Sequence, residues 1–308
     1  MITKESEKKF KAGFVAVLGR PNTGKSTLMN ALVGEKVSII SPIPQTTRHQ
    51  IRGILNLEGA QIVFVDTPGM HSFKDHLAEH LNVISKRSIE GSDIIVYVVD
   101  VSRRIGKEES RLMDIISTQN IPVIMVLNKI DLKSVYLNSY IEAWQKKADE
   151  KVGKKPSAQF IPVSAKTGKN IDELRAALLE NLPQSGPFYD TDTLTDFPIQ
   201  FRIADIVREK LFLALDRELP HSVAVEVSAI KDRKKVVHIE VTIYVQRNSQ
   251  KKIVIGKQGR GLKAIGTLAR SEIEKIYDKK VYLEIWVKVL SDWQHRPRIL
   301  KELGYWWV

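Results

Sequence analysis

The feature that most constrains the fold of this chain is a glycine-rich octapeptide that follows a short apolar run. Residues Gly19–Ser26 read Gly-x4-Gly-Lys-Ser, and they come directly after Phe14–Leu18, which has the composition of a buried strand. A loop of this kind between a strand and a helix directs backbone N–H groups and a helix dipole at phosphate oxygens. The octapeptide therefore predicts a strand–loop–helix unit that holds a nucleoside triphosphate.

The individual loop residues have separate expected roles. Lys25 carries the charge that meets the β- and γ-phosphates, and the Ser26 hydroxyl is a Mg²⁺ ligand. The residues that we expect to contact the phosphates are Gly19, Asn22, Thr23, Gly24, Lys25, Ser26 and Thr27.

Four further apolar runs alternate with helical patterns in the first half of the chain, namely Ile62–Val65, Ile94–Val99, Val123–Leu127 and Phe160–Val163. Alternation of strands and helices, together with the glycine-rich loop, predicts an α/β P-loop domain with a mostly parallel sheet and helices on both faces. Ligands of such sheets bind beyond the carboxyl ends of the strands. Each motif described next follows one of these runs.

The first such motif, Asp66-Thr67-Pro68-Gly69, ends the run Ile62–Val65. An acid at this strand end can hold Mg²⁺, and the Gly69 N–H can meet the γ-phosphate, so that the following loop responds to hydrolysis. We assign Lys25, Asp66 and Gly69 to catalysis, and all four motif residues to nucleotide binding.

Two further motifs indicate which nucleotide base is bound. They are Asn128-Lys129-Ile130-Asp131 after Val123–Leu127 and Ser164-Ala165-Lys166 after Phe160–Val163. A carboxylate such as that of Asp131 can accept two hydrogen bonds from N1–H and N2–H₂ of guanine, and adenine offers no such pair. Asn128 can brace the pocket, Lys129 can cover the ring, and the Ser164–Lys166 backbone can donate to O6. The order of these motifs favours GTP over ATP.

The net charge of +12 is concentrated in the second half of the chain. Residues 197–308 contain 22 Lys/Arg and 13 Asp/Glu, whereas residues 1–196 contain 26 and 23. The stretch from Pro183 to Asp196 has the composition of a linker. We therefore divide the chain into a GTP-binding domain (1–182), a linker (183–196) and a basic domain (197–308) with the pattern of an α+β fold.

The basic domain contains a Gly-x-x-Gly turn, Gly256–Gly259, that enters a helix expected at Arg260–Tyr277. KH modules clamp about four nucleotides with such a turn, and the strand and helix order indicates a type II KH-like domain. Ile253, Ile255, Leu262, Ile265 and Leu268 are candidates for its apolar groove. The residues expected to bind single-stranded RNA are Lys252, Ile253, Gly256, Lys257, Gln258, Gly259, Arg260 and Lys263.

The residues of these motifs, together with a first switch at Pro44–His49, resemble those of the Era family of bacterial ribosome-associated GTPases over essentially the whole chain. The resemblance implies a GTPase that uses Mg²⁺ with GTP as substrate and GDP as product. It implies RNA near the 3′ end of small-subunit rRNA, and the small ribosomal subunit itself, as partners. We expect a cytoplasmic monomer with peripheral contact to the inner face of the cell membrane.

The same resemblance makes a threonine of the first switch a Mg²⁺ ligand with a catalytic role; we favour Thr47 over Thr46. Met70 stands where Ras-like enzymes place a water-orienting glutamine, so intrinsic hydrolysis should be slow. Asn22 resembles a loop asparagine that coordinates K⁺ in some relatives, which predicts a stimulating K⁺ ion. A purely structural role for Asn22 is the alternative.

Two other functions fit parts of the pattern. The basic domain could bind anionic lipid in a membrane-associated signalling GTPase, or the nucleotide site could be vestigial in an RNA-binding module. No apolar run approaches the ~20 residues of a membrane span, and the chain has no cysteine for a disulfide. His76 and His80 have metal-ligand spacing but no third ligand, and the tail Tyr305-Trp306-Trp307 is expected to pack or to contact a partner.

Overall fold

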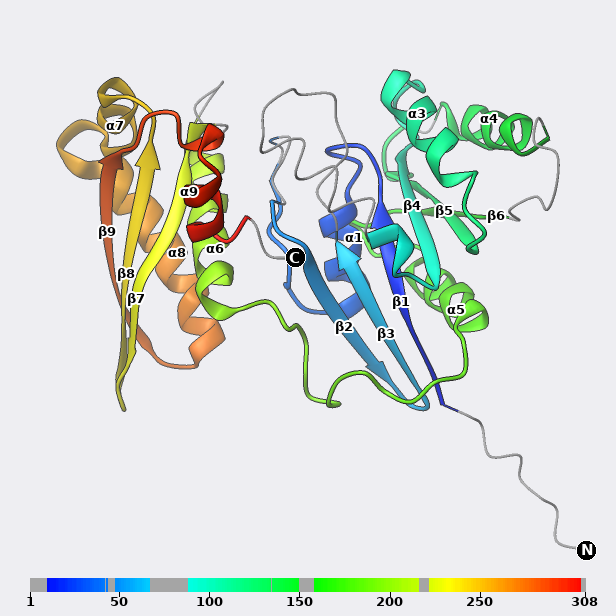
Figure 1. Cartoon of the computed structure of the whole chain (residues 1–308), viewed down its shortest axis with the longest axis horizontal. Coiled ribbons are helices and arrows are strands. Elements are labelled where there is room, and N and C mark those ends of the chain that lie inside the picture. Colours follow the sequence, from blue (N-terminus) through cyan, green and yellow to red (C-terminus); the bar gives the residue numbers. More distant parts are fainter. Residues whose placement is uncertain are drawn as a thin grey trace, which may run out of the picture. The chain divides into compact units, whose positions relative to one another are not determined.

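A computed structural model describes residues 10–41, 43, 48–66, 88–133, 135–149, 158–215 and 222–305 (Figure 1). Contacts divide the chain into two units. The first ends at Asp196, and the second comprises residues from Phe197 onward together with the described part of Ile39–His49. The expected functional residues 44–47 and 67–70, His76, His80 and the last three residues of the tail lie outside the described range.

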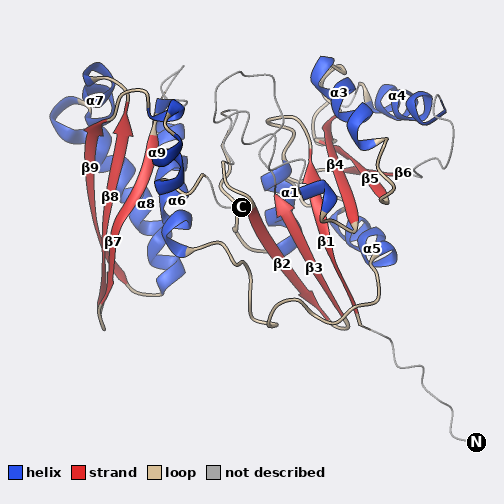
Figure 2. Ribbon diagram, in the orientation of Figure 1, coloured by secondary structure: helices blue, strands red, loops and turns tan. Residues whose placement is uncertain are grey.

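The first unit is built on a six-stranded sheet of order β2-β3-β1-β4-β5-β6 (Figure 2). All pairs are parallel except that of β2 with β3. The five strands predicted from apolar runs are present, and β2 is an additional edge strand. The strands are β1 (Lys11–Leu18), β2 (Ile51–Leu57), β3 (Ala60–Asp66), β4 (Ile94–Asp100), β5 (Val123–Asn128) and β6 (Ala158–Val163).

Helices cover both faces of this sheet, as the alternating pattern predicts. On one face α3 (Lys107–Ile116) and α4 (Leu137–Asp149) share an apolar core with β4 and β5. On the other face α1 (Lys25–Val33) packs on β1, β2 and β3 and contacts α5 (Ile171–Asn181). The α/β P-loop architecture is therefore confirmed, and the carboxyl ends of β1, β3, β4, β5 and β6 share one edge.

The predicted linker is bound to the edge of the first sheet. The N–H of Ile54 in β2 donates to the carbonyl of Leu194, and Arg52 lies 2.7 Å from the Asp196 carboxylate. The side-chain oxygen of Gln61 accepts the backbone N–H of Tyr189. Since an open edge strand presents unpaired backbone groups, these bonds protect β2 from pairing with another chain.

The second unit is a three-stranded sheet of order β7-β8-β9, in which β8 pairs antiparallel with β7 and parallel with β9. Helices α6 and α8 pack against each other and against the sheet (Figure 2). This topology is that of a type II KH domain, as predicted. The elements are α6 (Ile199–Ala214), β7 (Ala224–Asp232), β8 (Val236–Val245), α7 (Asn248–Ile255), α8 (Arg260–Tyr277), β9 (Lys280–Val289) and α9 (Pro297–Glu302).

Two details of the second unit differ from the sequence prediction. The apolar segment before the Gly-x-x-Gly turn belongs to a helix, α7, in which only Val254 is buried. The sequence pattern near Trp293–Leu303 predicts a single helix, and this prediction is wrong, because a 3₁₀ turn at Trp293–His295 is followed by a separate α9 that begins at Pro297. Proline favours the first helical position because it has no N–H to bond and its φ is preset.

Candidate nucleotide site and nucleic-acid interface

The glycine-rich loop connects β1 to α1 at the carboxyl edge of the sheet. Gly24 has φ of +97°, and a Cβ there would lie 2.4 Å from Asn128 Nδ2. A side chain at this position would therefore be strained and would collide with β5. Asn22 also has positive φ, and the backbone oxygen of buried Thr23 accepts a hydrogen bond from Asn128 Nδ2 at 2.8 Å. The loop and the base-recognition motif are thus directly bonded.

Lys25, the first residue of α1, is folded back onto the loop. Its Nζ donates to the carbonyls of Gly19 and Arg20 at 3.0 and 2.9 Å. Burial lowers the pKa of Lys25 to about 8, although the carboxylate of Asp66 acts in the opposite direction. A buried ammonium held by neutral carbonyls is poised to exchange them for phosphate oxygens, which carry full charge.

The predicted Mg²⁺ ligands meet beside this lysine. Ser26 Oγ donates to Asp66 Oδ2 at 2.8 Å, and Ser38 Oγ donates to the same oxygen at 3.0 Å. Asp66 ends β3 and is buried. A carboxylate and a hydroxyl are the hard oxygen donors that Mg²⁺ prefers, so Ser26 and Asp66 fit a Mg²⁺ ion that also binds phosphates.

The base-recognition residues come together from the ends of β5 and β6. Asn128 Oδ1 accepts the N–H of Ala165 at 3.0 Å, and Ser164 Oγ donates to Asp131 Oδ1 at 2.7 Å. Asp131 is itself exposed, as is Lys166. The carboxylate is therefore oriented by Ser164 while it keeps acceptor capacity for a guanine edge.

Lys129 has a partner that the sequence reasoning missed. Its Nζ donates to the backbone oxygen of Asn22 at 2.8 Å and to Asp100 Oδ2 at 2.7 Å. Burial alone would raise the pKa of Asp100, but hydrogen bonds from Lys129 and Ser102 bring that pKa below the usual value. Asp100 is the last residue of β4, as Asp66 is the last residue of β3. This position at a strand end could have marked Asp100 as a site residue in the sequence.

A second missed group supports the loop from α3. Arg20 Nε lies 2.5 Å from Glu109 Oε1, and Glu109 is buried. The other carboxylate oxygen of Glu109 accepts the N–H of Gly106 and so caps α3. A loop arginine and a glutamate in an amphipathic helix carry no pairing signal in the sequence, since only the fold brings them together.

The Gly-x-x-Gly turn of the second unit joins α7 to α8 through a 3₁₀ turn, Lys257–Gly259. Gly256 has φ of +72°, and a Cβ there would lie 2.9 Å from the backbone nitrogen of Gly261. Gln258 and Gly259 also have positive φ. The side chains of the predicted RNA-binding cations are exposed around this turn, namely Lys252, Lys257, Arg260 and Lys263.

The predicted groove residues separate into two groups. Ile253 and Leu268 are each 57% exposed, whereas Ile265 is 1% exposed and belongs to the core of the second unit. Ile255 and Leu262 are partly buried and pack against that core. Only the exposed and half-buried members can line a groove, so Ile265 belongs to the core and not to the predicted groove.

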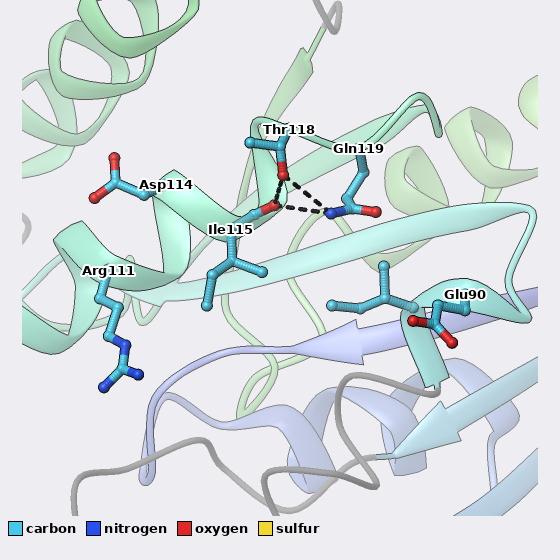
Figure 3. A pocket seen from close by; sticks show the side chains of 7 residues that line it. Glu90, Arg111, Asp114, Ile115, Thr118 and Gln119 are labelled. Carbon is cyan, nitrogen blue, oxygen red and sulfur yellow. Dashed lines mark hydrogen bonds between the residues drawn. The ribbon is translucent and has the colours of Figure 1, made fainter.

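A cavity of about 450 Å³ lies away from these motifs, against α3 (Figure 3). It is lined by Ile89, Glu90, Arg111, Asp114, Ile115, Thr118 and Gln119. The Ile115 carbonyl accepts from both Thr118 Oγ1 and Gln119 Nε2, which closes the end of α3 (Figure 3). None of the lining residues belongs to a nucleotide or RNA motif.

Comparison with known proteins identifies relatives of both units. A family described as 50S ribosome-binding GTPase matches residues 14–129, and a family described as KH domain matches residues 218–294. GTPase Era of Geobacter sp. (strain M21) is 45% identical over 97% of this chain and 99% of its own length. GTPase Era of Geobacter metallireducens is 42% identical with the same coverage.

Two solved structures of Era are similar to this chain over nearly its whole length. Era in complex with MgGDPNP and nucleotides 1506–1542 of 16S ribosomal RNA is similar with a TM-score of 0.90 and 40% identity. The match covers 96% of this chain and 99% of that one. A tyrosine-to-alanine variant of Aquifex aeolicus Era bound to GDP·AlF₄⁻ is similar with a TM-score of 0.89, 40% identity and the same coverage.

Proposed function

Because this chain belongs to the Era family of GTPases, we propose that it is a GTP-hydrolysing switch that binds single-stranded rRNA and acts in maturation of the small ribosomal subunit. The observation that carries the proposal is the near full-length similarity to Era bound to MgGDPNP and 16S rRNA. In this chain the described residues of the nucleotide motifs lie at one sheet edge, and the cations beside the Gly-x-x-Gly turn are exposed.

Hydrolysis transfers the γ-phosphoryl group to water, so that the water oxygen bonds to phosphorus as the bond to the bridging oxygen of GDP breaks. The loop backbone and Lys25 hold the phosphates, while Asp131 and Asn128 hold the base. Ser26 and Asp66 supply oxygen ligands to Mg²⁺, which neutralises charge on the β- and γ-phosphates. We also propose Thr47 as a Mg²⁺ ligand and Thr67, Pro68 and Gly69 as the γ-phosphate sensor.

The residue after Gly69 leaves the attacking water without its usual side-chain partner, since Met70 stands in place of glutamine and cannot orient water. We propose that K⁺ held by Asn22 offsets the charge that develops during hydrolysis. GTP turnover is measured in equal concentrations of KCl and NaCl for the full chain and for Asn22→Ala. Faster turnover in K⁺ that Asn22→Ala abolishes is expected, and equal rates in the two salts would refute this assignment.

RNA binding by the second unit is tested with a labelled oligonucleotide that copies the 3′ end of small-subunit rRNA. Gly256→Asp places a negative charge and a side chain in the turn, and should weaken RNA binding by about tenfold or more. Gly186→Asp is the matched control, because Gly186 is exposed with open space where a Cβ would lie. Equal RNA affinity of the two variants would contradict the assigned turn.

The site of action is a separate part of the proposal. We propose that the protein works in the cytoplasm, with peripheral contact to the inner face of the membrane through its basic domain. Within the part of the chain that the structure describes, no helix combines the length and apolarity needed to cross a bilayer. Binding to anionic liposomes that RNA does not compete away would favour the lipid-binding alternative, and GTP turnover absent even with RNA and K⁺ would favour a vestigial site.

A further inference from the structure

The backbone of the loop Gly19–Ser26 adopts conformations that an unrestrained chain rarely holds. Asn22 has φ of +63°, and Gly24 has φ of +97°. A residue other than glycine keeps such a conformation only where the surrounding structure fixes it. Two residues of the base-recognition motif, Asn128 and Lys129, supply part of this restraint through hydrogen bonds to loop carbonyls.

A further restraint is the ion pair between Arg20 of the loop and Glu109 of α3. Arg20 Nε lies 2.5 Å from Glu109 Oε1, and the Glu109 side chain is 1% exposed, against 23% for Arg20. Removing one member of a buried pair leaves the other charge uncompensated, which costs far more free energy than the intact pair contributes. Each of these two side chains therefore fixes the position of the other.

Glu109 is itself held by α3 and β4. Its other carboxylate oxygen accepts the N–H of Gly106 at 3.0 Å, and its backbone carbonyl accepts the hydroxyl of Tyr97 at 3.4 Å. Tyr97 is a fully buried residue of β4, and burial, with the Glu109 charge, raises its pKa well above the usual value, so that the hydroxyl stays a donor. Helix α3 shares an apolar core with β4 and β5. Glu109 thus ties the loop to a packed helix.

The backbone of Arg20 lies in the phosphate-binding part of the loop. Its carbonyl accepts Lys25 Nζ at 2.9 Å and Thr23 Oγ1 at 3.0 Å. Lys25 is the residue that the proposed function places on the phosphates. A shift of Arg20 therefore displaces a carbonyl that holds this lysine.

We propose that Glu109 is a positioning residue that, through Arg20, holds the phosphate loop in its nucleotide-binding conformation before the nucleotide arrives. The inference rests on the proposed function and adds to it a residue outside the nucleotide motifs. A preformed loop does not have to be ordered on binding, and preorganisation of this kind raises affinity. Once bound, the phosphates hold the loop themselves, so hydrolysis of bound GTP does not depend on Glu109.

A purely electrostatic effect of the pair would have the opposite sign for one of its members. Neutralising Glu109 makes the surroundings of the loop more positive, which by itself strengthens the attraction for phosphates. Neutralising Arg20 makes them less positive and weakens that attraction. Positioning instead predicts weaker nucleotide binding in both cases, because each change breaks the same pair.

The test measures GDP affinity and steady-state GTP turnover of the full chain. Glu109→Gln keeps an oxygen that can accept the Gly106 N–H and removes the charge that pairs with Arg20. Arg20→Met keeps the apolar stem and removes the guanidinium. The variant with both substitutions completes a double-mutant cycle. Glu173→Gln is the matched control, since Glu173 is likewise the third residue of its helix, α5, and is exposed.

We expect the Kd for GDP to rise about tenfold in Glu109→Gln, in Arg20→Met and in the double variant, because breaking the pair once removes the whole effect. Two independent sites would give a loss of about a hundredfold in the double variant. The KM for GTP should rise by about the same factor while kcat stays within about twofold, since only binding is lost. Glu173→Gln should match the wild type in each measurement.

A merely structural role is tested with Leu112→Ala. Leu112 is 3% exposed in the core that α3 shares with β4 and β5, so alanine destabilises the same helix and leaves the ion pair in place. Positioning predicts that Leu112→Ala keeps GDP affinity within about twofold of the wild type. A loss of affinity as large as that of Glu109→Gln, at a similar decrease in the free energy of unfolding, would overturn the inference.

The possible failures are distinguishable. If Glu109→Gln binds GDP as tightly as the wild type or more tightly, the positioning role is wrong while GTP binding and hydrolysis stand. If the wild type binds no guanine nucleotide, the proposed function itself is wrong. Should Glu109→Gln not fold, Arg20→Met and the double variant decide, and a further loss of about tenfold in the double variant overturns the inference.

Discussion

Lys25→Met should stabilise the nucleotide-free first unit at neutral pH while it abolishes GTP binding. Lys25 is buried, and burial lowers its pKa from 10.5 to about 8. A difference of one pH unit between the folded-state and unfolded-state pKa corresponds to about 1.4 kcal/mol, so keeping this lysine charged at pH 7 costs about 3 kcal/mol. Methionine fills similar space without the charge but withdraws the hydrogen bonds to Gly19 and Arg20.

The net magnitude follows from these two effects. The Arg20 carbonyl keeps a hydrogen bond from Thr23 Oγ1, so the main loss is at Gly19, about 1 kcal/mol. We therefore expect Lys25→Met to raise the free energy of unfolding of the first unit by about 2 kcal/mol at pH 7. In the nucleotide complex the phosphates neutralise the Lys25 ammonium, so the free-energy cost of burying this charge applies only to the nucleotide-free protein.

The sign of the pH dependence separates this explanation from a packing effect. Between the folded-state pKa of about 8 and the ordinary value of 10.5, the unfolded state holds the Lys25 proton more tightly than the folded state. Wild-type stability therefore rises with pH over this window. The advantage of the methionine variant is greatest below the folded-state pKa and should shrink as the pH approaches the ordinary value.

Urea unfolding of fluorotryptophan-labelled protein provides the assay, because the Trp144 resonance reports the first unit separately. Measurements at about pH 7 and about pH 9.5, on the two sides of the folded-state pKa, compare wild type, Lys25→Met and Lys146→Met, where Lys146 is exposed on α4. The control should match the wild type at both values. A Lys25→Met protein that is less stable at neutral pH, or whose advantage does not shrink with pH, would refute the reasoning.

Three further predictions concern the two sites. Asp131→Asn should lower GTP affinity by about a hundredfold, because two charge-assisted hydrogen bonds to guanine are lost, and should raise XTP affinity, since an amide donates to the xanthine 2-oxygen; competition binding checks both. Gly24→Ala should weaken nucleotide binding about tenfold or more by strain and collision with Asn128, measured by titration calorimetry. Gly256→Ala should weaken RNA binding more than Gly259→Ala, because a Cβ at Gly259 meets open space, and equal losses in RNA titrations would contradict this.

Much of the nucleotide site could be predicted from local sequence because its chemistry depends on the chain direction. A parallel strand delivers the residue after it to one edge of the sheet, so Asp66, Asn128 and Ser164 had to meet near Gly19–Ser26. The observed bonds between Asn128 and the loop follow from that rule. Buried strands also carry strong apolar runs, which is why five of them were visible.

Elements without a continuous apolar signal were missed. Strand β2 contains Arg52, Gly53 and Asn56, and it pairs antiparallel at an edge that the segment ending at Asp196 covers. Helix α7 buries only Val254, so its pattern lacks the helical period that betrays a packed face. Both elements contact neighbours in the chain, β2 in a hairpin with β3 and α7 against α8, so what the local pattern lacks is a continuous apolar face.

The sequence by itself therefore determined the two kinds of module, the triphosphate loop with its base specificity and the position of the Gly-x-x-Gly turn. Only the tertiary structure decided that Arg20 meets Glu109, that Lys129 meets Asp100 and that Arg48 is buried beneath Tyr305. A motif can be predicted from sequence because its residues are neighbours in the chain, and the loop or strand end that carries them fixes their geometry. Buried ion pairs and sockets join residues up to 257 positions apart, and only the folding of the whole chain brings them together.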